Sequence, residues 1–165
     1  ARAFAGPALG ALAPNLVPRS ILPRAIALSS IAWQSGAIAG PALAGVPLTH
    51  RELTQGFTVI SGHAAPGDPG STLDWEALAR ANTTLVIMMG VATLSAITTE
   101  LIKHGLASET PAMTIADAAM ASQQSVRGTL TDIAVRTEEA GIKPPAITVI
   151  GAVAGFALTA HQDQD

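Results

Sequence analysis

TLVIMM, residues 84–89, is an apolar run that ends immediately before Gly90. Short runs that are rich in β-branched and large apolar residues predict buried strands. Three other segments have the same character, namely FTVIS at 57–61, AMTI at 112–115 and AITVI at 146–150. Together they predict a sheet of at least four strands within residues 46–151.

Amphipathic helices are predicted between these strands. The expected helices span residues 73–81, with Asp74 as cap, 93–104 and 129–140. Their predicted buried residues are Leu94, Ile97, Leu101 and Ile102 in the second helix, and Leu130, Ile133 and Ala134 in the third. Gly105 and Gly141 stand where a left-handed residue commonly ends a helix. The pattern predicts an α/β domain, a sheet covered by helices.

The amino-terminal part has a different composition. Residues 25–49 form a stretch without charged side chains, and this stretch is long enough to span a bilayer. Arg19 and Arg24 precede it. A buried helix and turn in a soluble protein explains the same stretch, because several glycines and Pro41 interrupt it. Both interpretations stay open here. Residues 157–165 are expected to form a disordered tail.

Composition narrows the classes of function. Charged residues make up 13% of the chain, the net charge is −3, and there is no cysteine. These values do not favour nucleic-acid binding, and they exclude disulfides and thiolate metal sites. The chain starts with Ala1 and shows no signal-peptide pattern, so a fragment is expected.

Residues 45–51 (GVPLTHR), followed by FTVISGH at 57–63, resemble the interdomain passage of uroporphyrinogen-III C-methyltransferases. Members of that family have G-I-P-L-T-H-R and then a strand that ends in T-G-H. Further similar motifs follow in order: LDW at 73–75, TLVIMMG at 84–90, Thr110-Pro111, Gln123, RGTL at 127–130 and PPA at 144–146. The chain is therefore similar to the carboxy-terminal half of a tetrapyrrole methylase over residues 37–151.

Residues 3–45 resemble instead a segment of a major facilitator superfamily transporter, through LVPR at 16–19 and GPALAG at 40–45. AIAGPALAG at 37–45 fits both families. The two resemblances predict a chimera, with a helical transporter-like segment at 1–45, a methylase domain at 46–156 and a tail at 157–165. A membrane association is expected only if residues 25–47 insert.

The methylase resemblance implies transfer of methyl groups from S-adenosylmethionine to uroporphyrinogen III, giving precorrin-2 for sirohaem or cobalamin synthesis. The family's amino-terminal domain supplies a glycine-rich loop that is not visible here, so the chain is expected to be inactive alone. The resemblance further implies a tetrapyrrole substrate, a cytoplasmic location and a homodimer in the full-length family. The alternative functions are a transporter fragment or a non-functional chimera.

The resemblance also implies binding residues. Those expected near S-adenosylmethionine are Ser35, Gly36, Met89, Thr110, Pro111 and Ala118, and Arg127 is expected to meet a tetrapyrrole carboxylate. A thioether at the end of a strand suits packing on an adenine face, although Met89 could equally be a core residue. An exposed strand residue is the favoured interpretation of Arg127. Met89 and the backbone around Ala118 are predicted to line a shallow concave surface at the carboxyl ends of the strands.

No catalytic residue and no metal site is predicted. His50 and His63 are separated by a strand-sized segment, and no third ligand has suitable spacing. The loop AAPGDPGS at 64–71 imitates a glycine-rich phosphate loop, but nothing like G-x-G-x-x-G accompanies it. It is expected to be a surface loop.

Overall fold

The computed structural model describes residues 46–118 and 120–156. The chain divides into two compact units, 1–38 and 39–165, and every described residue belongs to the second. The predicted transporter-like segment 1–45 and the predicted tail 157–165 lie outside the described residues. Within the described part, no helix is both long enough and apolar enough to cross a membrane.

The described residues build a five-stranded mixed sheet. Its strands are β1 (Phe57–Ser61), β2 (Thr84–Met88), β3 (Pro111–Ala116), β4 (Gln124–Thr129) and β5 (Ala146–Ile150), in the order β1-β2-β5-β3-β4. β1 runs parallel to β2, whereas β5 is antiparallel to both of its neighbours, and β4 is antiparallel to β3. β1, β2 and β3 therefore end at the same edge of the sheet. All four predicted strands are confirmed.

The apolar pattern of the sequence did not predict β4. Its residues read QSVRGT, and the first two are exposed, so the segment has neither an apolar run nor β-branched enrichment. Among the described strands, β4 pairs only with β3 and lies at the margin of the sheet, where this one partner strand supplies its backbone hydrogen bonds. An edge strand of this kind leaves little hydrophobic pattern in a sequence.

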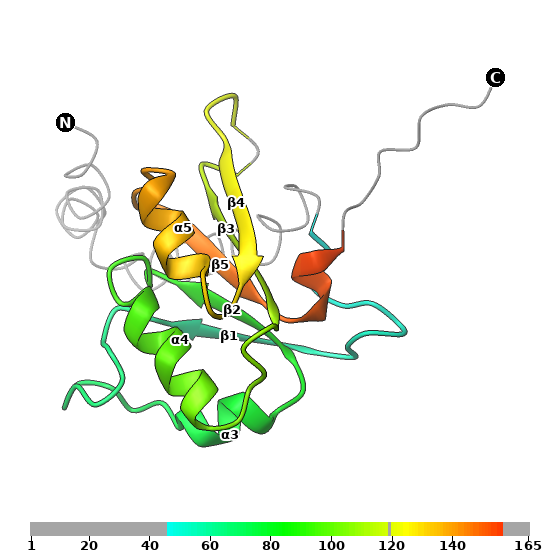
Figure 1. Ribbon diagram of the computed structural model, residues 1–165, viewed down its shortest axis with the longest axis vertical. Helices are drawn as coiled ribbons and strands as arrows, with labels where there is room; N and C mark the ends of the chain where they lie inside the picture. The colour runs from blue at the N-terminus through cyan, green and yellow to red at the C-terminus, as the bar shows by residue number, and fades with distance from the viewer. Residues whose placement is uncertain (1–45, 119, 157–165) are drawn as a thin grey trace, which may run out of the picture. The chain divides into compact units, whose positions relative to one another are not determined.

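Three helices lie on one face of the sheet, as Figure 1 shows: α3 (Trp75–Arg80), α4 (Leu94–Lys103) and α5 (Ile133–Glu139). The predicted helices are confirmed, but the third starts at Ile133 because Thr129 still belongs to β4. Asp74 caps α3 as predicted, since its Oδ1 accepts from the Ala77 amide at 2.9 Å. Gly105 and Gly141 follow α4 and α5 with φ of 96° and 65°, as expected of helix-ending glycines.

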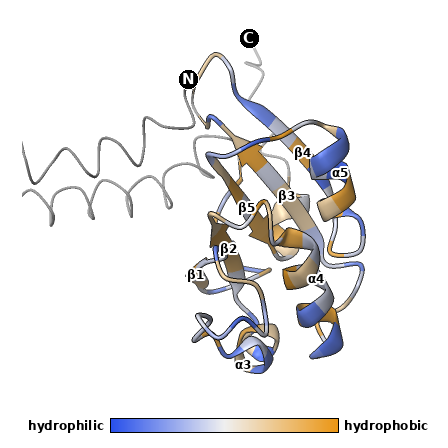
Figure 2. Cartoon of the chain, turned by 90° about the vertical axis from the view of Figure 1, so that its left-hand side faces the viewer, coloured by the Kyte–Doolittle hydropathy of each residue, from blue (hydrophilic) through white to orange (hydrophobic). Residues whose placement is uncertain are grey.

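The main core lies between the helices and the sheet. Its buried members are Ile60, Trp75, Ala79, Leu85, Ile87, Leu94, Ile97, Leu101, Ala112, Leu130, Ile133 and Ile150. In Figure 2 the strands β2 and β5 are mostly hydrophobic, while α4 and α5 carry hydrophobic and hydrophilic bands. The prediction for Ile102 was wrong: its side chain is 36% exposed, because it is turned about 100° from the buried Leu101 around the helix.

The other face of the sheet carries a smaller core under the short helix η2 (Ala152–Gly155). Its buried residues are Val46, Met113, Ile115, Val149, Val153 and Ala154. Val46 is fully buried in this smaller core.

A chain of threonine hydroxyls crosses the helix-covered side. Thr148 of β5 lies 3.0 Å from Thr114 of β3, Oγ1 to Oγ1, and the Thr137 Oγ1 of α5 lies 3.0 Å from that of Thr114. The Thr137 hydroxyl also lies 2.7 Å from the Ile133 carbonyl oxygen, to which it can only donate. All three residues are at most 2% exposed, so each hydroxyl has found a partner away from water.

The loops that follow β1 and β2 touch through two glycines. A Cβ placed on Gly62 would lie 2.9 Å from the Gly90 Cα and 2.8 Å from the Ile87 Cγ2. The Gly62 amide donates to the Met88 carbonyl at 2.8 Å, which joins the end of β1 to the end of β2. Only glycine allows the two backbones to approach this closely.

We therefore expect Gly62→Ala to lower the free energy of unfolding by about 1–3 kcal/mol, the usual range for overpacking. Urea denaturation of the whole chain measures the change. Gly56→Ala is the matched control, because a Cβ there meets only the Thr83 Cγ2 at an ordinary 3.5 Å. Equal stabilities of the two variants would contradict the close approach.

The turn between β4 and α5 is braced by Asp132. Its Oδ1 accepts from the Thr129 amide at 2.7 Å, and its Oδ2 accepts from the Arg136 Nε at 2.5 Å. The amide hydrogen bond from Thr129 first, and then the Arg136 guanidinium, hold the pKa of Asp132 below its ordinary value. Both interactions favour the ionised carboxylate.

A lowered pKa in the folded state contributes stability above the ordinary carboxyl pKa, and this contribution disappears as the pH falls through the folded-state value. Asp132→Asn should therefore be less stable than the wild type near pH 7, and the difference should shrink below about pH 4. Thermal unfolding from pH 7 to pH 3 checks this. Glu139→Gln, at an exposed position of the same helix, is the control. A constant difference across this range would refute the charge-dependent brace.

Candidate functional site

The carboxyl ends of β1, β2 and β3 meet along one side of the sheet, which we call the carboxyl edge. It is formed by the residues that follow these strands: Gly62, Met89 and Asp117. The strand register fixes this arrangement, because Ser61 pairs with Met88, Met88 with Ile147, and Ala116 with Ala146. Ligands of open α/β sheets gather at such an edge.

Met89 is the most unusual residue at the carboxyl edge. The first four residues of β2 are buried, yet Met89 directly after the strand is 54% exposed. Its φ is 55°, in the left-handed region that residues other than glycine seldom adopt. Asp117, at the equivalent position after β3, has a φ of 50°. Strained backbone of this kind costs about 1–3 kcal/mol and is concentrated at functional sites.

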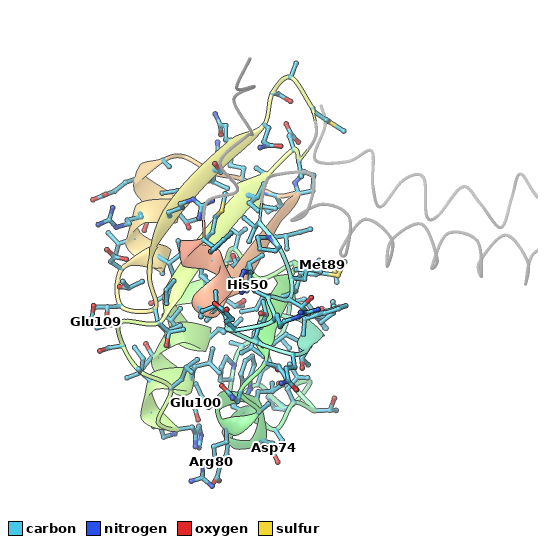
Figure 3. All side chains as sticks on the ribbon, turned by 90° about the vertical axis from the view of Figure 1, so that its right-hand side faces the viewer. His50, Asp74, Arg80, Met89, Glu100 and Glu109 are labelled. Carbon is cyan, nitrogen blue, oxygen red and sulfur yellow. The ribbon has the colours of Figure 1, made fainter. Side chains whose placement is uncertain are left out.

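The sequence could not decide whether Met89 is a core residue or a surface one. In the structure its thioether is at the surface, and Figure 3 shows the Met89 side chain at the margin of the domain. Met89 points outward because its left-handed backbone ends the extended conformation of β2. Met89 is thus placed where it can meet a ligand.

Ala118 lies on the turn between β3 and β4. Its side chain is partly buried against the smaller core. The turn is held by the Ser122 hydroxyl, which donates to the Asp117 Oδ2 at 2.8 Å, and by the Met120 amide, which donates to the Asp117 carbonyl at 3.0 Å. Met120 itself is 63% exposed. The sequence analysis did not single out this residue, although an isolated methionine in a polar turn was a visible signal.

Thr110 and Pro111 lie at the opposite edge of the sheet from Met89. They begin β3, and Pro111 pairs with the last residue of β4, Thr129. Six residues of β3 separate this end from the carboxyl edge, about 20 Å at the usual rise per residue. In Figure 3 Glu109, which precedes Thr110, lies on the opposite side of the domain from Met89. The structure thus brings Met89 and Ala118 to the carboxyl edge, whereas Thr110 and Pro111 lie at the other edge.

Thr110 and Pro111 instead line a cavity of about 230 Å³ at that opposite edge. Its wall includes Thr84 and Gly151. A second cavity, of about 440 Å³, lies between the start of α4 and the end of α5 and is lined in part by Ser95, Thr137 and Lys143. Neither cavity is lined by Met89 or Ala118. The predicted concave surface around these two residues is therefore not one of these cavities.

Arg127 lies in the middle of β4, opposite Met113. Its side chain is largely exposed, and its guanidinium donates through Nη1 to the Ala154 carbonyl of η2. This bond ties the edge strand to the short helix on the same face. The remaining predicted contacts, Ser35 and Gly36, lie outside the described residues.

The carboxyl edge offers an exposed thioether and backbone groups. Within the described residues, the carboxyls with lowered pKa values lie away from this edge: the Lys103 ammonium and then His104 lower the pKa of Glu100 in α4, and Asp132 directly precedes α5. Within the described ranges, no group of three His, Asp or Glu side chains could hold a metal ion. His63 hydrogen-bonds with the Ser61 hydroxyl, and the His50 and Phe156 rings meet at a tilt of 41° with 4.9 Å between their centroids. With an exposed thioether and backbone groups, the carboxyl edge can bind a flat, partly apolar ligand.

Comparisons with known proteins agree on one family. A model of the tetrapyrrole (corrin/porphyrin) methylases matches residues 35–134. An S-adenosyl-L-methionine-dependent uroporphyrinogen III methyltransferase of Methanosarcina barkeri is 49% identical over 108 residues, which are 66% of this chain and 42% of that protein. A siroheme synthase of Photorhabdus laumondii is 42% identical over 109 residues, 66% of this chain and 22% of that protein.

Solved structures show the same likeness. The uroporphyrin-III C-methyl transferase of Thermus thermophilus complexed with S-adenyl homocysteine has a TM-score of 0.55 and 30% identity, over 68% of this chain and 49% of that one. A cobalt precorrin-4 methyltransferase has a TM-score of 0.62 and 25% identity, over 72% and 49% of the two chains. This chain therefore spans less than half the length of these relatives. Because the family model matches more than half of the chain, the chain belongs to the tetrapyrrole (corrin/porphyrin) methylases.

Proposed function

We propose that this chain is part of an S-adenosylmethionine-dependent methyltransferase that acts on uroporphyrinogen III. The identity to the uroporphyrinogen III methyltransferase of Methanosarcina barkeri supports the reaction. The Thermus thermophilus relative with S-adenyl homocysteine supports the methyl donor. Precorrin-2 is the expected product, and sirohaem or cobalamin synthesis is the expected pathway. A cytoplasmic homodimer of the full-length enzyme belongs to the same proposal.

Met89 is the observation that carries this proposal. The adenosine part of the donor packs on its exposed thioether, and the backbone at Ala118 borders the same ligand from the neighbouring turn. A polarizable sulfur fits the face of an aromatic ring. The left-handed φ of Met89 gives an independent reason, because it keeps an apolar side chain exposed at the expense of backbone strain.

The donor supplies an activated methyl group, and the electron-rich carbon of the acceptor supplies the nucleophile. Such a transfer depends on placing the two reactants in line more than on a strong base. The carboxyl edge fits this requirement, because its described residues present a binding surface rather than an acid–base pair. Arg127 would have to meet a tetrapyrrole carboxylate with the guanidinium N–H groups that remain besides its bond to the Ala154 carbonyl.

Thr110 and Pro111 do not belong to the same ligand site in this proposal, because they lie at the other edge of the sheet. The alternative of a transporter fragment concerns residues 3–45, which lie outside the described part of the chain. No observation in the described part favours it. The chimera therefore stays a hypothesis about the amino-terminal segment alone.

Methionine-methyl NMR can test the donor site even if binding is weak. In the full chain labelled at its methionine methyl groups, S-adenosylhomocysteine should shift the Met89 signal through the ring current of adenine. Met113 is the internal control, because it is 2% exposed and buried in the smaller core. A Met89 signal that stays unchanged at millimolar ligand would refute the assignment.

A glycine substitution separates binding from stability in the same experiment. Met89→Gly should leave the free energy of unfolding unchanged or raise it by up to about 1 kcal/mol, because glycine accepts the positive φ without strain. Binding of S-adenosylhomocysteine, followed by the Gly90 amide shift, should weaken about tenfold. Asn82→Gly is the matched control, because Asn82 likewise has a left-handed φ, of 50°, but lines the cavity at the opposite edge.

The chain alone should not form precorrin-2 at a useful rate. A two-domain cleft encloses most of a ligand, so losing one wall removes donor contacts and the alignment of the acceptor carbon. Misplacement by about 1 Å can cost on the order of a hundredfold in rate. The measurement is precorrin-2 formation from the purified chain with S-adenosylmethionine, with and without a separately expressed amino-terminal methylase domain. Turnover equal to that of an intact relative would show that the chain is complete.

A further inference from the structure

Thr93 occupies the cap position of α4 but does not cap it. Asp74, at the equivalent position of α3, accepts from a first-turn amide at 2.9 Å, whereas the Thr93 side chain makes no such bond. Its hydroxyl donates instead to the Gly62 carbonyl in the loop after β1. The same hydroxyl lies 3.2 Å from the Gly90 carbonyl oxygen, to which the Thr93 amide also donates at 3.3 Å.

These bonds close a ring around Met89. On one side of Met89, the Met88 carbonyl accepts from the Gly62 amide at 2.8 Å. On its other side, the Gly90 carbonyl accepts from the Thr93 amide. The Thr93 hydroxyl then joins Gly62 to the start of α4 and completes the ring. Met89 is 54% exposed, while Gly62 and Gly90 on either side of it are buried.

We propose that Thr93 is a positioning residue for the methyl-donor site, and that its hydroxyl holds Met89 in the exposed, left-handed conformation. This inference rests on the donor site proposed above. Strain at Met89 persists only if the surrounding structure over-determines it. The ring around Met89 provides this constraint, and the close contact of the two glycines leaves no space for the turn to relax inward.

The hydroxyl of Thr93 acts through the buried Gly62 carbonyl. Without the Thr93 hydroxyl, this carbonyl would lose its hydrogen-bond donor at the start of α4. A buried acceptor without a hydrogen bond costs about 1–3 kcal/mol. The turn would then move to find water or another donor. Met89 lies between the two ends of that turn, so its thioether would leave the position in which it meets the ligand.

The test uses three variants of the full chain. Thr93→Val has the same shape but lacks the hydroxyl, and Thr93→Ser restores the hydroxyl without the methyl group. Thr131→Val is the matched control, because the Thr131 hydroxyl also donates to a backbone carbonyl, that of Ser108 at 3.1 Å, in the turn that precedes α5. Two quantities are measured for each: the affinity for S-adenosylhomocysteine from amide shifts, and the Met89 Cα and Cβ shifts, which report its φ.

Thr93→Val should weaken S-adenosylhomocysteine binding about fivefold, the effect of one hydrogen bond. It should also move the Met89 carbon shifts away from those of a left-handed residue. Thr93→Ser should bind within about twofold of the wild type. Thr131→Val should lose stability while keeping both the affinity and the Met89 shifts. A purely structural role would give Thr93→Val the same profile as Thr131→Val.

Failure of the two proposals can be told apart. If the wild-type chain binds and Thr93→Val binds equally well with unchanged Met89 shifts, the positioning role is refuted and the donor site stands. If the wild type shows no binding at millimolar ligand, the donor site is refuted. Without binding, the Met89 shifts still test whether Thr93 holds the turn. A change in Thr93→Val but not in Thr131→Val would show that it does, and unchanged shifts in Thr93→Val would refute this role as well.

Discussion

The backbones of Gly62 and Gly90 touch, and the geometry of the carboxyl edge depends on that contact. It brings the loops after two parallel strands closer together than any pair of side chains would allow. α4 can then begin close to both loops, so that one threonine reaches the carbonyls of each. The exposed methionine between them is a consequence of this packing, because the chain must turn with a positive φ to leave β2.

The two edges of the sheet have different properties. At the carboxyl edge, two residues other than glycine adopt left-handed conformations directly after strands, and two methionines are exposed. At the opposite edge, small polar and apolar side chains surround a cavity of about 230 Å³. Asn82 at the opposite edge also has a left-handed φ, so it is the exposed apolar side chain of Met89 on such a backbone that favours the carboxyl edge as a binding site. The relatives support the class of ligand, and the chain's own backbone supports its position.

The sequence predicted β1, β2, β3 and β5, because their apolar, β-branched runs leave a strong local signal; this holds even for the edge strand β1, whose Phe57 and Val59 are exposed. It missed β4, whose residues are polar and which exists through its pairing with β3. It assigned Ile102 to the buried face, because a residue adjacent to Leu101 satisfies a loose helical pattern. The motif around Met89 was visible, but its left-handed φ was not. That conformation follows from contacts between residues about 30 positions apart, such as Thr93 and Gly62.

The hydroxyl chain of Thr148, Thr114 and Thr137 links two strands and a helix in the core. Because each hydroxyl contributes one proton, a change at one position leaves a neighbour with an unmet polar group. A single replacement by valine is thus harmful, while replacement of all three by apolar residues of similar shape is close to neutral. Residues at these three sites should consequently covary among homologues, so that either all three carry a hydroxyl or all three are aliphatic. Such covariation would show that the three hydroxyls are selected as one hydrogen-bonded group rather than site by site.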